Sequence, residues 1–224
     1  ASERRLQHAL RASNAGMFDH DLISGSIYWS PEFREMIGVG LNDRLDLDYI
    51  FSLCHPADKS AHMADFARSN DPKGNGVLDS EFRMKVSDGT YHWIHVQCQT
   101  FFAGAGDERR PARAVGIIRD ITDRKQAEEL RSTLASIVEQ SNDFIGLATT
   151  DLNVTYLNRA AHELIGADNL PSGTVLNISD ILTPEGFEEF QAGLDARRYK
   201  GWGRREGEFR HFKTGQHIPV DIQS

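Results

Sequence analysis

Residues 116–129 read GIIRDITDRKQAEE, and this stretch decides the fold class. It begins as an apolar strand and passes near Thr122 directly into a charged run of helix-forming residues. No glycine or proline interrupts residues 122–140, so we predict one continuous helix there. A strand joined to a long helix without a loop indicates a domain that passes a movement of its sheet to that helix.

Five segments of the first half of the chain are typical of strands. Polar and apolar residues alternate along the longer of these segments, which follow one another as hairpins. We therefore predict an antiparallel sheet with one buried face. The five segments are residues 17–23, 26–30, 77–86, 90–102 and 112–121.

The long interval between the second and third of these segments carries helix signals. Ser30-Pro31 is a serine cap followed by proline, which predicts a helix that ends at Gly38. His55-Pro56 predicts another helix, which reaches about Asn70. Short helices at this place must cover the apolar face of the sheet. We therefore predict an α+β domain whose enclosed core readily holds one small ligand.

The second half of the chain repeats the first. The segment from Leu10 to Gly38 aligns without a gap on the segment from Val138 to Gly166. Further on, Glu81-Phe82-Arg83 aligns with Glu208-Phe209-Arg210 once a small deletion is allowed between the two matches. The repeat predicts two domains of one fold. They are residues 1–121, which include a leader helix over 3–13, and residues 141–224, joined by a helical linker over 122–140.

The second copy stops early, because no counterpart of residues 103–121 follows it. We therefore expect the second sheet to lack an edge strand, which leaves backbone groups unpaired. We also expect the parent protein to continue beyond Ser224.

Four motifs resemble those of the PAS family: YWSPEFREMIG (28–38), CHPADK (54–59), SDGTYHWI (87–94) and the strand-to-helix exit RDIT (119–122). The resemblance covers nearly the whole chain in two copies. It implies two PAS-like domains, each a five-stranded antiparallel sheet covered on one face by short helices. It also implies a sensory fragment with an output domain in the same chain, for which a histidine kinase of two-component signalling is the first expectation. The alternatives are a cyclic-di-nucleotide enzyme, a transcription regulator, or a dimerisation scaffold that binds nothing.

Strand parity identifies the side chains that would face a ligand. His20 is the polar member of the first set, and His211 replaces Met84 in the second. Two alternatives to ligand contact remain for these histidines. Each bonds a nearby backbone carbonyl, or the assignment of inward and outward faces is reversed. The candidates are Phe18, His20, Phe82, Met84, Ile94, Val96 and Cys98 in the first copy, and Phe209, His211, Val220 and Ile222 in the second.

An apolar stripe follows the predicted linker helix. Ala127, Leu130, Leu134, Ile137 and Ser141 recur at alternating spacings of three and four, which is typical of a coiled-coil seam. We therefore predict a homodimer, with an amphipathic connector packed on one domain as the alternative. The predicted signal relay comprises Arg119, Asp120, Ile121, Thr122, Leu130, Leu134 and Ile137.

Composition argues against several classes of partner. The net charge is −8 and no basic cluster occurs, which speaks against nucleic acid and acidic membranes. No apolar run approaches the roughly 20 residues that a membrane span needs. Cys54 and Cys98 lack metal spacing and a disulfide framework, so we expect a reduced, cytoplasmic setting.

No catalytic motif is found, and we expect no enzyme activity or metal site in this fragment. His162-Glu163-Leu164 resembles a phosphoacceptor motif, but Ala167 stands where that motif has proline. Neither cysteine lies in the asparagine-cysteine-arginine motif of flavin photosensors. The resemblance implies haem as one alternative, because haem-binding members of the family place a ligand histidine on the helix after the proline turn, where His62 lies. A solvated surface histidine is the more common case. The cofactor is left open.

Overall fold

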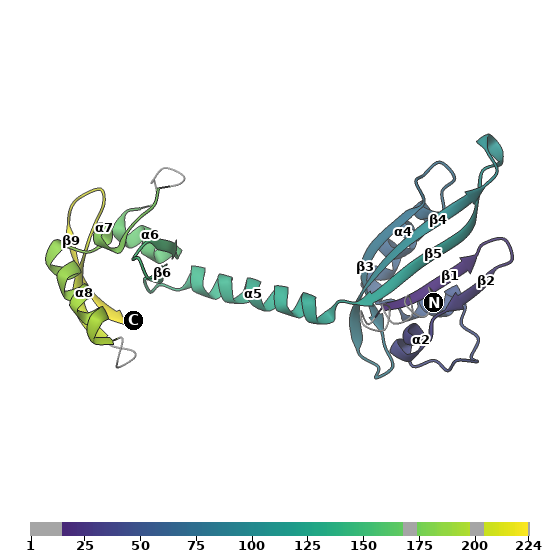
Figure 1. The fold of residues 1–224 in the computed structure, drawn as a ribbon, viewed down its shortest axis with the longest axis horizontal. Coiled ribbons are helices and arrows are strands. Elements are labelled where there is room, and N and C mark those ends of the chain that lie inside the picture. Colours follow the sequence, from purple (N-terminus) through teal and green to yellow (C-terminus); the bar gives the residue numbers. More distant parts are fainter. Residues whose placement is uncertain (1–14, 168–173, 198–203, 224) are drawn as a thin grey trace, which may run out of the picture. The chain divides into compact units, whose positions relative to one another are not determined.

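The computed structural model describes residues 15–167, 174–197 and 204–223, and the chain divides into two compact units (Figure 1). The first unit ends at Glu129 and the second begins at Leu130. Both residues belong to one helix, α5 (Thr122–Gln140). The leader helix predicted over residues 3–13 lies outside the described residues.

The first unit contains the predicted five-stranded antiparallel sheet. Its strands follow the order β2-β1-β5-β4-β3, so β5 is central and pairs with both β1 and β4. In β5, a Cβ atom on Gly116 would lie 2.6 Å from the carbonyl oxygen of Gln97, so glycine fits this close approach. The strands are β1 (Ala15–Asp21), β2 (Ser26–Trp29), β3 (Val77–Lys85), β4 (Tyr91–Ala103) and β5 (Arg110–Asp120).

Helices α2 (Pro31–Ile37), α3 (Leu47–Leu53) and α4 (Pro56–Ser69) cover one face of this sheet (Figure 1). The predicted signals around α2 are confirmed, because Ser30 Oγ accepts a hydrogen bond from the backbone N–H of Phe33. Gly38 ends α2 with a left-handed φ of 72°. A short 3₁₀ helix, η1 (Gly106–Glu108), lies between β4 and β5.

The face of the sheet that the alternation predicted to be buried forms the core. Phe82 and Ile94 are opposite each other on β3 and β4, and both are almost fully buried. Phe33 of α2 packs on the same cluster and has no exposed surface. The other buried members of the cluster are Phe18, Trp29, Ile37, Leu45, Ile50, Cys54, Leu78, Met84, Val96, Cys98, Ala114 and Ile118.

A bidentate ion pair fastens α4 to β3. Arg83 donates to both carboxylate oxygens of Asp58 at 2.8 Å, and the backbone N–H of Arg83 donates at 3.0 Å. The side chains are only 33% (Arg83) and 19% (Asp58) exposed. The hydrogen bonds from Arg83 lower the pKa of Asp58 to about 2. This carboxylate therefore stabilises the fold in its ionised form.

Replacing Asp58 with asparagine should lower the free energy of unfolding by about 1–3 kcal/mol near neutral pH, because charge-assisted bonds are lost. The ionised carboxylate stabilises fully above the unfolded pKa of about 3.9. That advantage should disappear as the pH falls from about 4 towards about 2. Urea unfolding across this pH range measures the difference between the variant and the wild type. The exposed Asp48, changed to asparagine, is the control, and an equal loss in both variants would contradict this role of Asp58.

The second unit repeats the local pattern of the first. Helix α6 (Arg159–Ile165) is the counterpart of α2 in the repeat, and Asn158 caps it where Ser30 caps α2. Gly166 ends α6 in the left-handed conformation, as Gly38 ends α2. The other elements are β6 (Gly146–Ala148), β7 (Val154–Leu157), α7 (Ile178–Ile181), α8 (Pro184–Arg197), β8 (Arg204–Arg210) and β9 (His217–Gln223).

The strands of the second unit do not form one five-stranded sheet. Within its described residues, β6 pairs only with β7, and β8 pairs only with β9. In the first unit, β5 joins the corresponding two hairpins from the centre of the sheet. The described part of the second copy does lack one strand. The prediction that this strand lies at the edge of the sheet is wrong, because the strand without a counterpart is the central one.

The structure also changes the alignment of β8 with β3, its counterpart in the repeat. In the first unit Cys54 forms an isolated bridge to Met84, and in the second unit Leu182 forms the corresponding bridge to Phe209. Phe209 therefore occupies the place of Met84, and the prediction that His211 does so is wrong. The Glu-Phe-Arg match is two residues out of register. A shift of two keeps the same face of a strand, so Phe209 still points inward as expected.

No helix in the described part of the chain is long and apolar enough to span a membrane.

Candidate functional site

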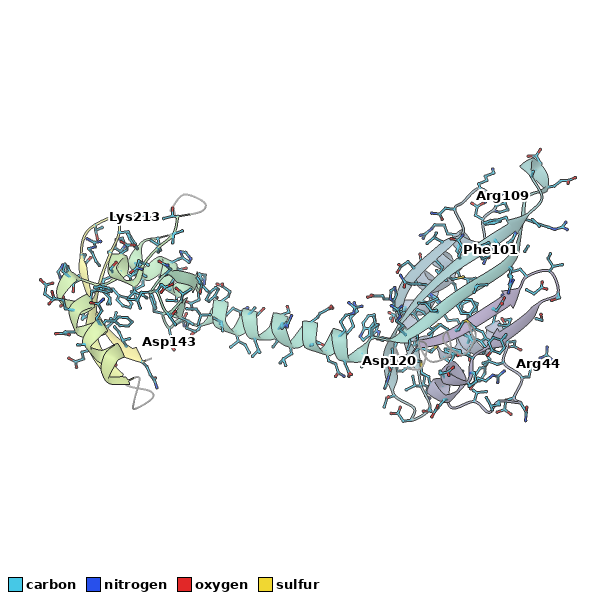
Figure 2. The ribbon with its side chains drawn as sticks, in the orientation of Figure 1. Arg44, Phe101, Arg109, Asp120, Asp143 and Lys213 are labelled. Atoms are coloured by element: carbon cyan, nitrogen blue, oxygen red, sulfur yellow. The ribbon has the colours of Figure 1, made fainter. Side chains whose placement is uncertain are left out.

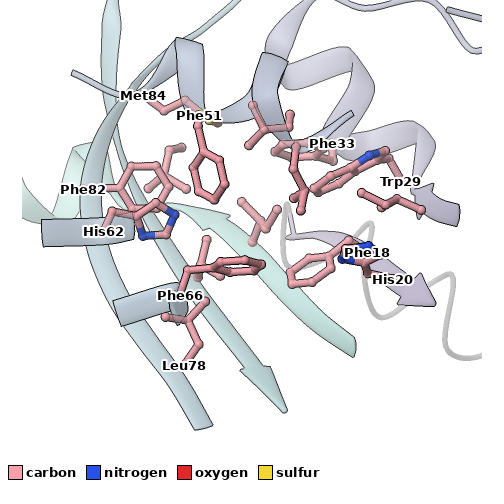
Figure 3. Close-up of a pocket in the computed structure, with 16 residues that line it drawn as sticks. Phe18, His20, Trp29, Phe33, Phe51, His62, Phe66, Leu78, Phe82 and Met84 are labelled. Carbon is pink, nitrogen blue, oxygen red and sulfur yellow. The ribbon is translucent and has the colours of Figure 1, made fainter. Parts of the chain in front are cut away.

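The first unit contains a small cavity between the sheet and helices α3 and α4 (Figure 3). Its volume is about 40 Å³. Six of the seven side chains predicted for this copy line it, namely Phe18, His20, Phe82, Met84, Ile94 and Val96. Cys98 is buried on the same face but is not part of the lining. The cavity is thus built on the face that strand parity indicated.

His62 of α4 is the polar residue of the lining that the strand pattern did not identify. It is only 5% exposed, so the expectation of a solvated surface histidine is wrong. Its ring stacks on Phe82 with the centroids 3.7 Å apart, and Nδ1 lies 3.2 Å from Ser80 Oγ. Burial lowers the pKa of His62 to about 4, although the nearby Asp65 carboxylate opposes this shift. The ring is therefore neutral at physiological pH.

His20 of β1 is the second polar residue of the lining and lies beside Phe18 (Figure 3). It is 7% exposed, and burial lowers the pKa of His20, so this ring is neutral as well. In the described part of the chain no hydrogen bond to the His20 ring is found. The alternative that His20 bonds a backbone carbonyl therefore does not hold there. A buried imidazole without a hydrogen-bond partner, as at His20, is an unusual feature, since buried polar groups generally find partners.

The size of the cavity limits what it holds in this arrangement. An engineered cavity of about 150 Å³ holds one benzene molecule, so about 40 Å³ suits only a few non-hydrogen atoms. A haem group does not fit unless several aromatic side chains move. Among the described residues no three histidine, cysteine, aspartate or glutamate side chains form a group that could hold a metal ion.

Neither cysteine offers a reactive thiol. Cys54 and Cys98 are both free and buried. Burial raises the pKa of each thiol to about 11, so the nucleophilic thiolate is scarce near neutral pH.

The junction between β5 and α5 is held by side chains of the predicted relay. Figure 2 shows Asp120 at the point where the strand passes into the helix. Asp120 Oδ1 accepts from the backbone N–H of Thr122 at 2.8 Å, and Oδ2 lies 2.5 Å from His92 Nδ1. The backbone N–H of Trp93 donates to Thr122 Oγ1, and that of Ile121 to the carbonyl of Trp93. Burial raises the pKa of Asp120, but the bonds from Thr122 and His92 outweigh it and the pKa is lowered.

Glu81 of β3 fixes the first turn of α5 to the outer face of the sheet. Its two oxygens lie 2.6 Å from Arg124 Nη2 and 2.6 Å from Lys125 Nζ. Lys125 also lies 5.1 Å from the ring centroid of Trp93. The bond from Lys125, followed by that from Arg124, lowers the pKa of Glu81. Alternation along residues 77–86 predicts that Glu81 points outward, but no sequence pattern pairs it with Arg124 and Lys125, which lie far away along the chain.

The predicted seam of α5 is exposed. Leu130, Leu134 and Ile137 retain 59%, 52% and 61% of their surface. At the end of the helix, the side chain of Asn158 donates to the carbonyl of Val138 at 3.0 Å. Within the described part of the chain, Leu130, Leu134 and Ile137 therefore remain largely uncovered.

The second unit carries a cleft of about 770 Å³. Phe209, Val220 and Ile222 line it as predicted, but His211 does not. His211 lies past the end of β8, where Nδ1 accepts from the backbone N–H of Lys213 at 3.2 Å. Its ring lies against Gly166. This histidine shapes the turn between β8 and β9 instead of facing a ligand.

Comparison with known families gives two matches along the chain. A family described as PAS fold matches residues 26–118, and a family described as PAS domain matches residues 132–199.

Among curated proteins, the chain is 29% identical over 136 residues to the two-component sensor PprA of Pseudomonas aeruginosa. This match covers 59% of the chain and 14% of PprA. The chain is 27% identical over 175 residues to the sensor protein FixL of Bradyrhizobium diazoefficiens, covering 76% of the chain and 33% of FixL. Both matches span less than half of the relative.

Among solved structures, a sensory box histidine kinase/response regulator from Burkholderia thailandensis is 29% identical with a TM-score of 0.49. The match covers 59% of this chain and 97% of that one.

Proposed function

The chain belongs to the PAS family and carries two PAS domains in tandem, and from this premise we propose that it is a sensory module that transmits a signal through α5. The first unit would bind a small molecule in its cavity, and the junction of β5 and α5 would pass the change to the helix. Dimerisation through α5 and an output domain in the same protein complete the proposal.

One observation carries this proposal: a cavity-lining strand continues directly into the helix. Ile118 lines the cavity, and α5 begins at Thr122, four residues later. Glu81, which anchors the helix, is the neighbour of Phe82, which also lines the cavity. Because packed cores rearrange between discrete states, a shift of either strand would change the position of the first turn of α5.

Xenon tests this coupling, since it enters small apolar cavities. In NMR spectra of the wild type under xenon, we expect shifts of the Ile118 and Val96 methyl groups and also of the amides from Asp120 to Gln126. In Glu81→Gln, the cavity methyls should shift as before, and the amides of the first turn should shift less. These amides should also exchange with solvent roughly tenfold faster, because two ion pairs and the packing on Trp93 are weakened.

Glu128→Gln is the matched control. Glu128 binds Arg124 from within the helix, at 2.9 Å, and among the described residues no ion pair joins it to the sheet. Methyl shifts without any change at the junction would rule out the relay. A dimer whose cavity methyls never respond would instead favour the ligand-free scaffold.

The proposal of an output domain rests on the relatives alone. The chain spans 14% to 33% of the length of the curated relatives it matches, and these are named a two-component sensor, a blue-light-activated histidine kinase and a sensor protein. We propose a sensor histidine kinase as the parent, with a cyclic-di-nucleotide enzyme or a transcription regulator as the alternative. A reduced, cytoplasmic setting is proposed with it, because both thiols are free and buried.

A further inference from the structure

The hydrogen bonds around His62 determine which ring nitrogen carries the proton. Ser80 Oγ lies 3.2 Å from Asp65 Oδ2 and 3.2 Å from His62 Nδ1. An ionised carboxylate only accepts, so the single hydroxyl proton of Ser80 goes to Asp65. Ser80 Oγ must then accept from His62, which places the imidazole proton on Nδ1.

The other ring nitrogen, Nε2, is therefore a bare acceptor. Phe82 stacks on the ring and Phe51 meets it edge-on, with the centroids 5.9 Å apart. No group in the described part of the chain donates to Nε2, and His62 is only 5% exposed in the lining of the cavity. A buried acceptor without a donor is unfavourable, and because His62 lines the cavity, a molecule in the cavity can supply that donor.

We propose that the cavity selects a small neutral hydrogen-bond donor, such as a short-chain alcohol, whose hydroxyl group donates to His62 Nε2. This rests on the proposed ligand-binding function and narrows its ligand class. The apolar lining disfavours ions, and the volume of about 40 Å³ restricts the ligand to a few non-hydrogen atoms. A ligand that only accepts hydrogen bonds would face the lone pair of Nε2 and lose the bond that a water molecule or an alcohol makes there.

Ethanol and acetonitrile form a matched pair of probes, because each has three non-hydrogen atoms and only ethanol donates. NMR of the ring nitrogens should first show Nδ1 protonated and Nε2 bare in the whole chain. On titration, ethanol should shift Nε2 and the lining methyl groups in a saturable way. Ethanol should bind about tenfold more tightly than acetonitrile, which corresponds to the loss of one hydrogen bond.

Ser80→Ala tests the origin of this selectivity. Without the Ser80 hydroxyl group, Nδ1 loses its acceptor, the proton is free to move to Nε2, and the preference for ethanol should fall to about twofold or less. Ser80→Thr keeps a hydroxyl group and should keep the preference. If Ser80→Ala does not fold, the wild-type tautomer and Ser80→Thr decide the matter.

Three results would overturn the inference. They are a proton on Nε2 in the wild type, equal binding of the two probes, and binding of neither probe, which leaves water as the occupant. Equal binding would leave the proposed ligand-binding function intact, whereas binding of neither probe would count against that function as well.

Discussion

Replacing Phe33 with alanine should lower the free energy of unfolding of the first unit by about 3–5 kcal/mol. Phe33 has no exposed surface and stacks on Trp29, with the ring centroids 4.9 Å apart. Trp29 in turn donates from Nε1 to the carbonyl of Leu45 at 3.1 Å, which ties the segment after α2 to the core. Truncation would leave a void beside this ring as well as removing buried apolar surface. Both effects act in the same direction.

Urea unfolding followed by the fluorescence of the tryptophans measures this loss. Phe101→Ala is the matched control, because Phe101 lies on β4 and is 54% exposed. It should cost less than about 1 kcal/mol. Phe33→Leu, which fills most of the space, should fall between the two. Similar losses for Phe33→Ala and Phe101→Ala would contradict the assignment of Phe33 to the centre of the core.

The second unit offers a natural comparison. Ala161 is the counterpart of Phe33 in the repeat, and it is also fully buried. Its cluster packs Phe144 against Phe209, with ring centroids 4.6 Å apart, whereas the first unit stacks Phe33 on Trp29. The two copies therefore preserve the caps and the apolar periodicity but fill their cores differently.

Local patterns predicted most of the first unit. Alternation has a period of two, so it identified the buried face of β3 and β4 without any knowledge of the partners of these strands. The place of β5 could not be predicted in this way, because strand order depends on contacts between distant segments. The match of identical residues also misplaced β8 by two positions. Alternation did not reveal this error, because a shift of two residues leaves the inward face of a strand unchanged.

The burial of His62 is the part of the site that the sequence did not predict. A single histidine on a polar helix carries no sign of burial by itself. The spacing did contain a signal, because His62, Phe66 and Ser69 recur at intervals of four and three and all face the sheet side of α4. This stripe is only weakly hydrophobic, so it did not indicate a buried face of the helix. The Ser80–Asp65 contact that orients the ring joins two elements and is not visible in either segment alone.

Changing Leu130 and Leu134 together to lysine should weaken self-association of the chain at least about a hundredfold. Both side chains are more than half exposed in the single chain, and they continue the seam of Ala127 and Ile137. Pairing two chains through this seam would bury four leucines, each contributing about 1–2 kcal/mol. The lysines would remove that gain and add repulsion between like charges.

Light scattering from low to high micromolar concentration measures the change. Ser132→Lys with Ser136→Lys is the control, because it adds the same charge to exposed positions on the opposite side of α5. This control should associate nearly as the wild type does, since it leaves the seam intact. If the wild type is already monomeric at high micromolar concentration, the exposed leucines do not pair two copies of this chain. The relay from Ile118 to Thr122 would then act within one chain, and the seam would need another apolar partner to carry the signal onward.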